Sequence, residues 1–150
     1  MMRRAGVSKL LAAALGLLLA GGAMAADVGH YVIGDVAAKT PGKVQPGLLL
    51  MGGGDRNFDA MRWFMKKAGN GHIVVLRASQ GGEIGEEFFN EVGGIKSVET
   101  FVFKDREAST DPKILAALKR ADGIFLAGGD QSRYVRYWRG TPVAAALEAH

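Results

Sequence analysis

The stretch GIFLAGGDQSRYVRYW, residues 123–138, joins an apolar strand to a helix through two glycines, Asp130 and Gln131. A similar stretch, LLLMGGGDRNFDAMRWF, occupies residues 48–64 and again contains an apolar run, glycines and an aspartate before a helix with one apolar face. Each pattern is typical of a buried strand that turns tightly into a helix. Repetition of this unit favours an α/β fold.

The remainder of the chain alternates in the same way after a poorly patterned lead-in segment at 26–46. The predicted strands are apolar on both faces, which is typical of parallel strands covered by helices. Asp111 followed by Pro112 is a typical start of one of the helices. We therefore predict an α/β fold with a mostly parallel sheet and helices on both faces, with strands at 47–51, 72–77, 98–103 and 123–127, and helices at 58–68, 83–92, 112–121 and after 142.

The N-terminal 25 residues have the layout of a secretory signal peptide. Three basic residues precede an apolar stretch at 10–20, and the small-residue triplet Ala-Met-Ala follows at 23–25. The apolar stretch is shorter than the roughly 20 residues that span a bilayer. We predict cleavage after residue 25, a periplasmic or extracellular location, and no stable membrane anchor after cleavage.

Composition excludes several kinds of function. Without the leader, 16 basic and 15 acidic residues remain, a net charge of +1, and no basic block predicts nucleic-acid binding. The chain has no cysteine, which excludes a disulfide scaffold or a thiolate site. Asn57 stands where a dinucleotide-binding loop needs its third glycine, and neither glycine loop has a phosphate-binding lysine. The three histidines have no metal-ligand spacing, so we predict no metal and no cofactor.

Two glycine loops are the candidate site. In open α/β sheets, ligands bind beyond the carboxyl ends of the strands, and helix N-termini there can hold an anion. Helix-capping roles for the two aspartates are the alternative interpretation. The candidate residues are Gly128, Gly129, Asp130 and Gln131 in one loop and Gly52, Gly53, Gly54 and Asp55 in the other.

Ser79, in RASQG, comes nearest to a nucleophilic serine. It follows a predicted strand, but Arg77 replaces the first glycine of the G-x-S-x-G elbow. We interpret Ser79 as a turn hydroxyl or a pocket wall. The residues therefore indicate anion-holding loops without a nucleophile or its base.

The blocks LLLMGGGDRNFDAMRWF, GHIVVLRAS, SVETFVF and ADGIFLAGGDQSRYVRYWRGTPV resemble the cyanophycinase family of serine peptidases. That family is related to aspartyl dipeptidase E and has a flavodoxin-like, three-layer fold similar to class I glutamine amidotransferases. The resemblance extends over about residues 47–150. It implies that this chain is the N-terminal half of a longer enzyme, with the nucleophilic serine, the histidine and the acid all beyond His150.

The resemblance also suggests roles for the loop residues. Gly128 and Gly129 would give a backbone N–H to the oxyanion, while Asp130 and Gln131 would line the pocket. The loop at 52–55 and Ser79 would form its wall. The implied substrate is an Asp-containing peptide or the aspartate–arginine polymer, cleaved through an acyl-enzyme. For Asp130, a helix cap and a pocket role both remain open.

Two other hypotheses remain open. The domain could be a non-enzymatic, amidotransferase-like one that binds a small anion at its glycine loops, or the chain could be complete, with purely structural loops. A four-stranded half-sheet would leave an apolar edge unpaired, so we expect residues 26–150 alone to aggregate. A homodimer is also open.

Overall fold

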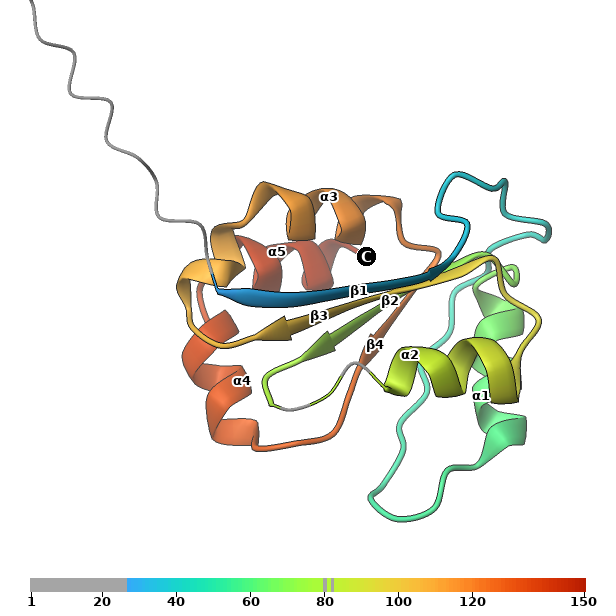
Figure 1. The fold of residues 1–150 in the computed structure, drawn as a ribbon, viewed down its shortest axis with the longest axis horizontal. Helices are drawn as coiled ribbons and strands as arrows, with labels where there is room; N and C mark the ends of the chain where they lie inside the picture. Colours follow the sequence, from blue (N-terminus) through green and yellow to red (C-terminus); the bar gives the residue numbers. More distant parts are fainter. Residues whose placement is uncertain (1–26, 80, 82) are drawn as a thin grey trace, which may run out of the picture.

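The computed structural model describes residues 27–79, 81 and 83–150 (Figure 1). The signal peptide predicted at 1–25 lies outside these residues, so export stays a prediction. None of the described helices is both long and apolar enough to cross a membrane.

The described residues form strands and helices in alternation. The strands are β1 (Val28–Gly34), β2 (His72–Arg77), β3 (Ser97–Phe103) and β4 (Gly123–Leu126). The helices are α1 (Phe58–Lys67), α2 (Ile84–Glu86), the π-helix η1 (Glu87–Val92), the 3-10 helix η2 (Glu107–Thr110), α3 (Pro112–Arg120), α4 (Gln131–Trp138) and α5 (Pro142–Ala149).

The four strands form one sheet in the order β1-β3-β2-β4. β2 pairs in parallel with both β3 and β4, whereas β1 pairs antiparallel with β3. Helices lie on both faces, as expected for a parallel sheet (Figure 1). The predicted α/β class with a mostly parallel sheet is confirmed, and the arrangement is consistent with a flavodoxin-like fold.

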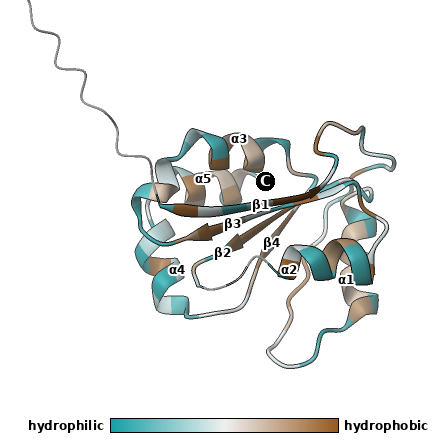
Figure 2. Cartoon of the chain, in the orientation of Figure 1, coloured by the Kyte–Doolittle hydropathy of each residue, from teal (hydrophilic) through white to brown (hydrophobic). Residues whose placement is uncertain are grey.

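Each face of the sheet has its own hydrophobic core. On one face, α1, α2 and η1 contribute Met61, Ile84 and Phe88 respectively. On the other, α3, α4 and α5 pack around Phe101 and Phe103. Figure 2 shows hydrophobic residues along the strands and hydrophilic residues on much of the helix surface. This two-sided burial explains why the sequence of β2 is apolar on both faces.

Local signals set the helix starts. Asp111 caps α3 by accepting a hydrogen bond from the Lys113 N–H at 2.8 Å, and Pro112 takes the first helical position, as predicted. The alternative interpretation of Asp55 as a cap is wrong, because α1 is capped by Asn57, which accepts from the Ala60 N–H at 3.0 Å. An Asn at the N-cap satisfies the same orphan donors as an Asp.

The predicted first strand at 47–51 is wrong. This segment is irregular, and the side chains of Leu48 and Leu50 are 80% and 84% exposed. Within the described residues, β4 pairs with β2 alone, so its outer edge is also without a partner. An apolar run can form a strand only where another strand accepts its backbone hydrogen bonds. The apolar pattern of residues 47–51 indicates that the segment can be buried, but it does not indicate whether a neighbouring strand is present to pair with it.

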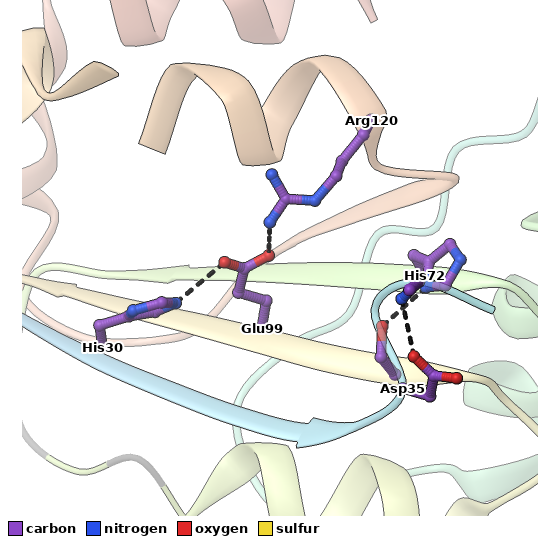
Figure 3. Close-up of polar contacts among 7 residues, drawn as sticks. His30, Asp35, His72, Glu99 and Arg120 are labelled. Carbon is purple, nitrogen blue, oxygen red and sulfur yellow. Dashed lines mark hydrogen bonds and ion pairs between the residues drawn. The ribbon is translucent and has the colours of Figure 1, made fainter. Parts of the chain in front are cut away.

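The lead-in segment contains a strand that its pattern did not predict. β1 runs antiparallel along the edge of the sheet, and its alternation of apolar and polar residues is weak because all seven of its residues are partly or fully exposed. The Glu99 carboxylate on β3 helps to hold it. It contacts His30 of β1 at 2.9 Å and accepts a hydrogen bond from Arg120 at the end of α3 (Figure 3). The His30 ring also stacks on Phe101.

We expect residues 26–150 to associate through the apolar segment at 47–51. Replacing both Leu48 and Leu50 with lysine should favour the monomer, because exposed charges block edge pairing and apolar contact. Val135→Lys is the matched control, because Val135 is also exposed, at 56%, but lies on helix α4. Sedimentation velocity over a range of concentrations measures the effect. A wild-type chain that is a soluble monomer with a sharp, reversible melt would contradict the prediction.

We expect Glu99→Gln to lower the free energy of unfolding. Glu99 is only 7% exposed, and the substitution weakens its charge-assisted contacts with His30 and Arg120. The loss should be about 1–3 kcal/mol, since both partners are themselves partly exposed. Urea denaturation measures it, with the exposed Glu148→Gln as the control, which should change stability by less than about 0.5 kcal/mol. Equal effects of the two substitutions would show that the contacts of Glu99 do not stabilise the sheet.

Candidate active-site loop

The ends of β2 and β4 bring two of the predicted site residues together. A Cβ atom added to Gly129 would lie 2.6 Å from the Ser79 Oγ and 3.5 Å from the Tyr134 hydroxyl. Gly129 also has a φ of +154°, a backbone conformation that residues with a side chain rarely adopt. A glycine is therefore required for this close approach. Ser79 borders the glycine loop, as a wall residue would.

The first turns of α4 fix this loop to both strand ends. The Tyr134 hydroxyl donates to the carbonyl of Ala127, with a second contact to the Gly128 carbonyl at 3.3 Å. Arg133 reaches the carbonyl of Ala78 at 3.4 Å. Burial raises the pKa of Tyr134, which keeps its hydroxyl a donor. The spacing of the aromatic residues in this segment is typical of helix packing and gives no sign of this hydrogen bond, because its acceptor lies seven residues earlier in the chain.

Asp130 is the N-cap of α4. Its carboxylate accepts a hydrogen bond from the Ser132 N–H at 2.9 Å. Hydrogen bonding by Ser132, from its side chain and then its backbone, holds the pKa of Asp130 below its usual value. Gln131 is the first residue of α4, and its side chain is exposed. The geometry thus gives Asp130 a capping role, while a pocket role for Asp130 or Gln131 stays a prediction.

The loop can offer its backbone to an anion. Gly128 and Gly129 are exposed, and within 27–79, 81 and 83–150 neither N–H has a backbone acceptor. They lie immediately before the N-terminus of α4, where the helix dipole favours negative charge. Exposed N–H groups at such a position can hold a carboxylate or a developing oxyanion.

The other glycine loop stands apart from these contacts. Gly52, Gly53, Gly54 and Asp55 are exposed, and a Cβ atom at any of the three glycines would meet nothing within 4 Å. Gly54 has a φ of +105°, so the turn itself requires a glycine there. No hydrogen bond of the described residues joins this loop to 128–131. Its role as a pocket wall stays a prediction.

A cavity of about 520 Å³ adjoins the paired strand ends. Ser79 lines it from the end of β2, Lys104 from the end of β3, and Arg133 and Arg136 from α4. The sequence pattern does not indicate this cavity, since its basic residues come from segments that are more than 25 positions apart. No group of three or more potential metal-ligating side chains occurs among the residues that the structure describes.

Comparison with known proteins gives a distant similarity. The chain is 29% identical over 115 residues to a cyanophycinase of Trichormus variabilis and, at the same identity and length, to one of Nostoc sp.. Each match covers 70% of this chain and 38% of the relative, so the chain spans well under half the length of these cyanophycinases. No protein-family model matches the sequence. The similarity supports a cyanophycinase-like relationship.

We expect Gly129→Ala to lower the free energy of unfolding by about 1–2 kcal/mol, because the new Cβ combines an unfavourable φ with the 2.6 Å approach to Ser79. Gly128→Ala is the matched control. Its Cβ would meet nothing within 4 Å, so the cost should stay below about 0.5 kcal/mol. Thermal or urea unfolding measures both. Adding Ser79→Ala should recover part of the loss, and equal losses at the two glycines would contradict the assignment.

Proposed function

We propose that this chain is the N-terminal part of an exported serine peptidase of the cyanophycinase type. The observation that carries the proposal is the similarity to two cyanophycinases, which also accounts for the glycine loop at the carboxyl end of β4. The proposed substrates are Asp-containing peptides or the aspartate–arginine polymer. Export rests on the leader pattern at 1–25.

In the proposed reaction, a serine hydroxyl beyond residue 150 attacks the scissile carbonyl while a histidine removes its proton. The carbonyl oxygen becomes an oxyanion, and the N–H of Gly128 or Gly129 donates to it. Collapse of this intermediate expels the amine, which takes a proton from the histidine and leaves an acyl-enzyme for water to hydrolyse. Gln131 would orient the scissile group through its amide, which can both donate and accept.

The structure supports the part assigned to this chain. The loop is held at both sides by α4, through Tyr134 at the end of β4 and Arg133 at the end of β2. Donors that are held in place before the reaction stabilise a developing charge without reorganisation, which is the usual basis of an oxyanion hole. The loop lies at the carboxyl ends of parallel strands, which is where ligand sites generally occur in α/β sheets.

The first test is the coding sequence downstream of codon 150. We expect an open frame that reaches a G-x-S-x-G elbow within a few tens of residues and continues to a histidine and an acid. The full-length protein should then hydrolyse Asp-containing dipeptides or the aspartate–arginine polymer and react with a fluorophosphonate at the elbow serine. A stop codon at that point, or an elbow without its serine, would contradict a serine peptidase and favour an anion-binding domain.

Gln131 provides a test within this chain. In the full-length enzyme, Gln131→Ala should lower kcat by about a hundredfold if its amide acts on the scissile group in the transition state. Gln45→Ala is the control, because the Gln45 side chain accepts a hydrogen bond from Lys67 at 3.2 Å and lies far along the chain from the loop. An unchanged kcat for Gln131→Ala would remove Gln131 from the proposed mechanism.

A further inference from the structure

Residues that follow β2 line two cavities that differ in net charge. The larger, of about 520 Å³, is lined by Lys104, Arg133 and Arg136. The smaller, of about 450 Å³, is lined by four glutamates together with Arg56 and Arg77. Among the described residues that line the larger cavity, none is acidic. Charge of one sign is therefore gathered in the larger cavity, while the smaller one contains its own counter-charges.

The arginines of the larger cavity are held in place by the fold. Arg133 and Arg136 are three residues apart on α4 and so project from the same face of that helix. Arg106 fixes the end of α4 by donating to the carbonyls of Arg136 and Arg139, each at 2.8 Å. Arg133 is oriented by its contact with the Ala78 carbonyl. Side chains whose helix is anchored in this way lose less entropy when they bind a ligand.

Two of these three cations have a carboxylate partner within the described residues. Arg133 is 3.8 Å from Asp130, a long contact on the exposed surface, and Lys104 pairs with Asp27 at 2.6 Å. The hydrogen bond that Lys104 donates to the Asp27 carboxylate raises the pKa of Lys104, so Lys104 stays charged near neutral pH. Arg136 forms no ion pair within the described part of the chain. An anionic ligand would therefore give Arg136 a partner of opposite charge.

We propose that this cavity is a subsite for a carboxylate group of the peptide substrate, held by Arg133 and Arg136 with Lys104 nearby. A guanidinium presents two N–H groups that match the two oxygens of a carboxylate. The volume of about 520 Å³ is large enough for an amino-acid residue. This subsite rests on the proposed peptidase function, and it deepens that function by naming the group that the enzyme recognises.

The position of the cavity connects it to the chemistry. Ser79 lines the cavity and is also the residue that Gly129 approaches most closely. A substrate carboxylate held by Arg133 and Arg136 would thus lie in a cavity that shares Ser79 with the surroundings of the proposed oxyanion loop. Such a contact fixes the scissile bond at a set distance from the carboxylate, which is how a specificity pocket selects its substrate.

Binding to the mature full-length protein tests the subsite separately from catalysis. The probe is N-acetyl-L-aspartate, observed by ligand NMR at low protein concentration, and its uncharged diamide and inorganic phosphate are the comparison ligands. We expect the aspartate derivative to bind more tightly than either. Arg136→Gln and Arg133→Gln should each weaken its binding by about tenfold, the effect of losing one charge-assisted contact.

Arg139→Gln is the matched control, since it removes the same charge just beyond the end of α4 from a residue that does not line the cavity. It should weaken binding by less than about twofold. Equal effects of Arg136→Gln and Arg139→Gln would overturn the proposal, as would equal binding of the diamide. Tighter binding of phosphate would overturn the assignment to a carboxylate. Specific carboxylate binding by a protein that hydrolyses no peptide would support the subsite and contradict the peptidase function.

Discussion

The parallel pairing of β2 with both β3 and β4 is the constraint on which the rest of the structure depends. It places the carboxyl ends of three strands at one edge of the sheet, where Ser79, Lys104 and the 128–131 loop follow them. It also buries β2 on both faces, so that helices must cover both sides. The candidate loop and the basic cavity both result from this arrangement, because both are built at strand ends.

Helix α4 converts these strand ends into a defined site. Asp130 starts the helix, Tyr134 holds the last carbonyls of the β4 segment, and Arg133 reaches the end of β2. One short helix therefore determines the shape of the glycine loop and supplies two cations to the neighbouring cavity. A loop held from both sides can keep its N–H groups directed at a ligand. Such fixed donors suit a site that stabilises negative charge.

The two outer strands of the sheet, β1 and β4, differ in what lies beside them. β1 pairs antiparallel with β3, and Glu99 of β3 contacts both His30 of β1 and Arg120 at the end of α3. On the β4 side, the described residues offer no pairing strand, and the apolar segment at 47–51 lies exposed. The relatives that match this chain are more than twice as long as the matched region. Both the segment at 47–51 and the outer side of β4 need a neighbouring strand to accept their backbone hydrogen bonds.

The sequence by itself determined the features that depend on neighbouring residues. These are the α/β class, the strands at 72–77, 98–103 and 123–127, the cap at Asp111 and the two glycine loops, since periodicity, capping and turn chemistry are local. Only the tertiary structure decided that 47–51 is not a strand, that β1 joins the sheet, that Ser79 lies against Gly129, and that Lys104 shares a cavity with Arg133 and Arg136. Each of these depends on a partner that is distant in sequence, and a local pattern can indicate that a residue needs a partner but not where the fold will supply one.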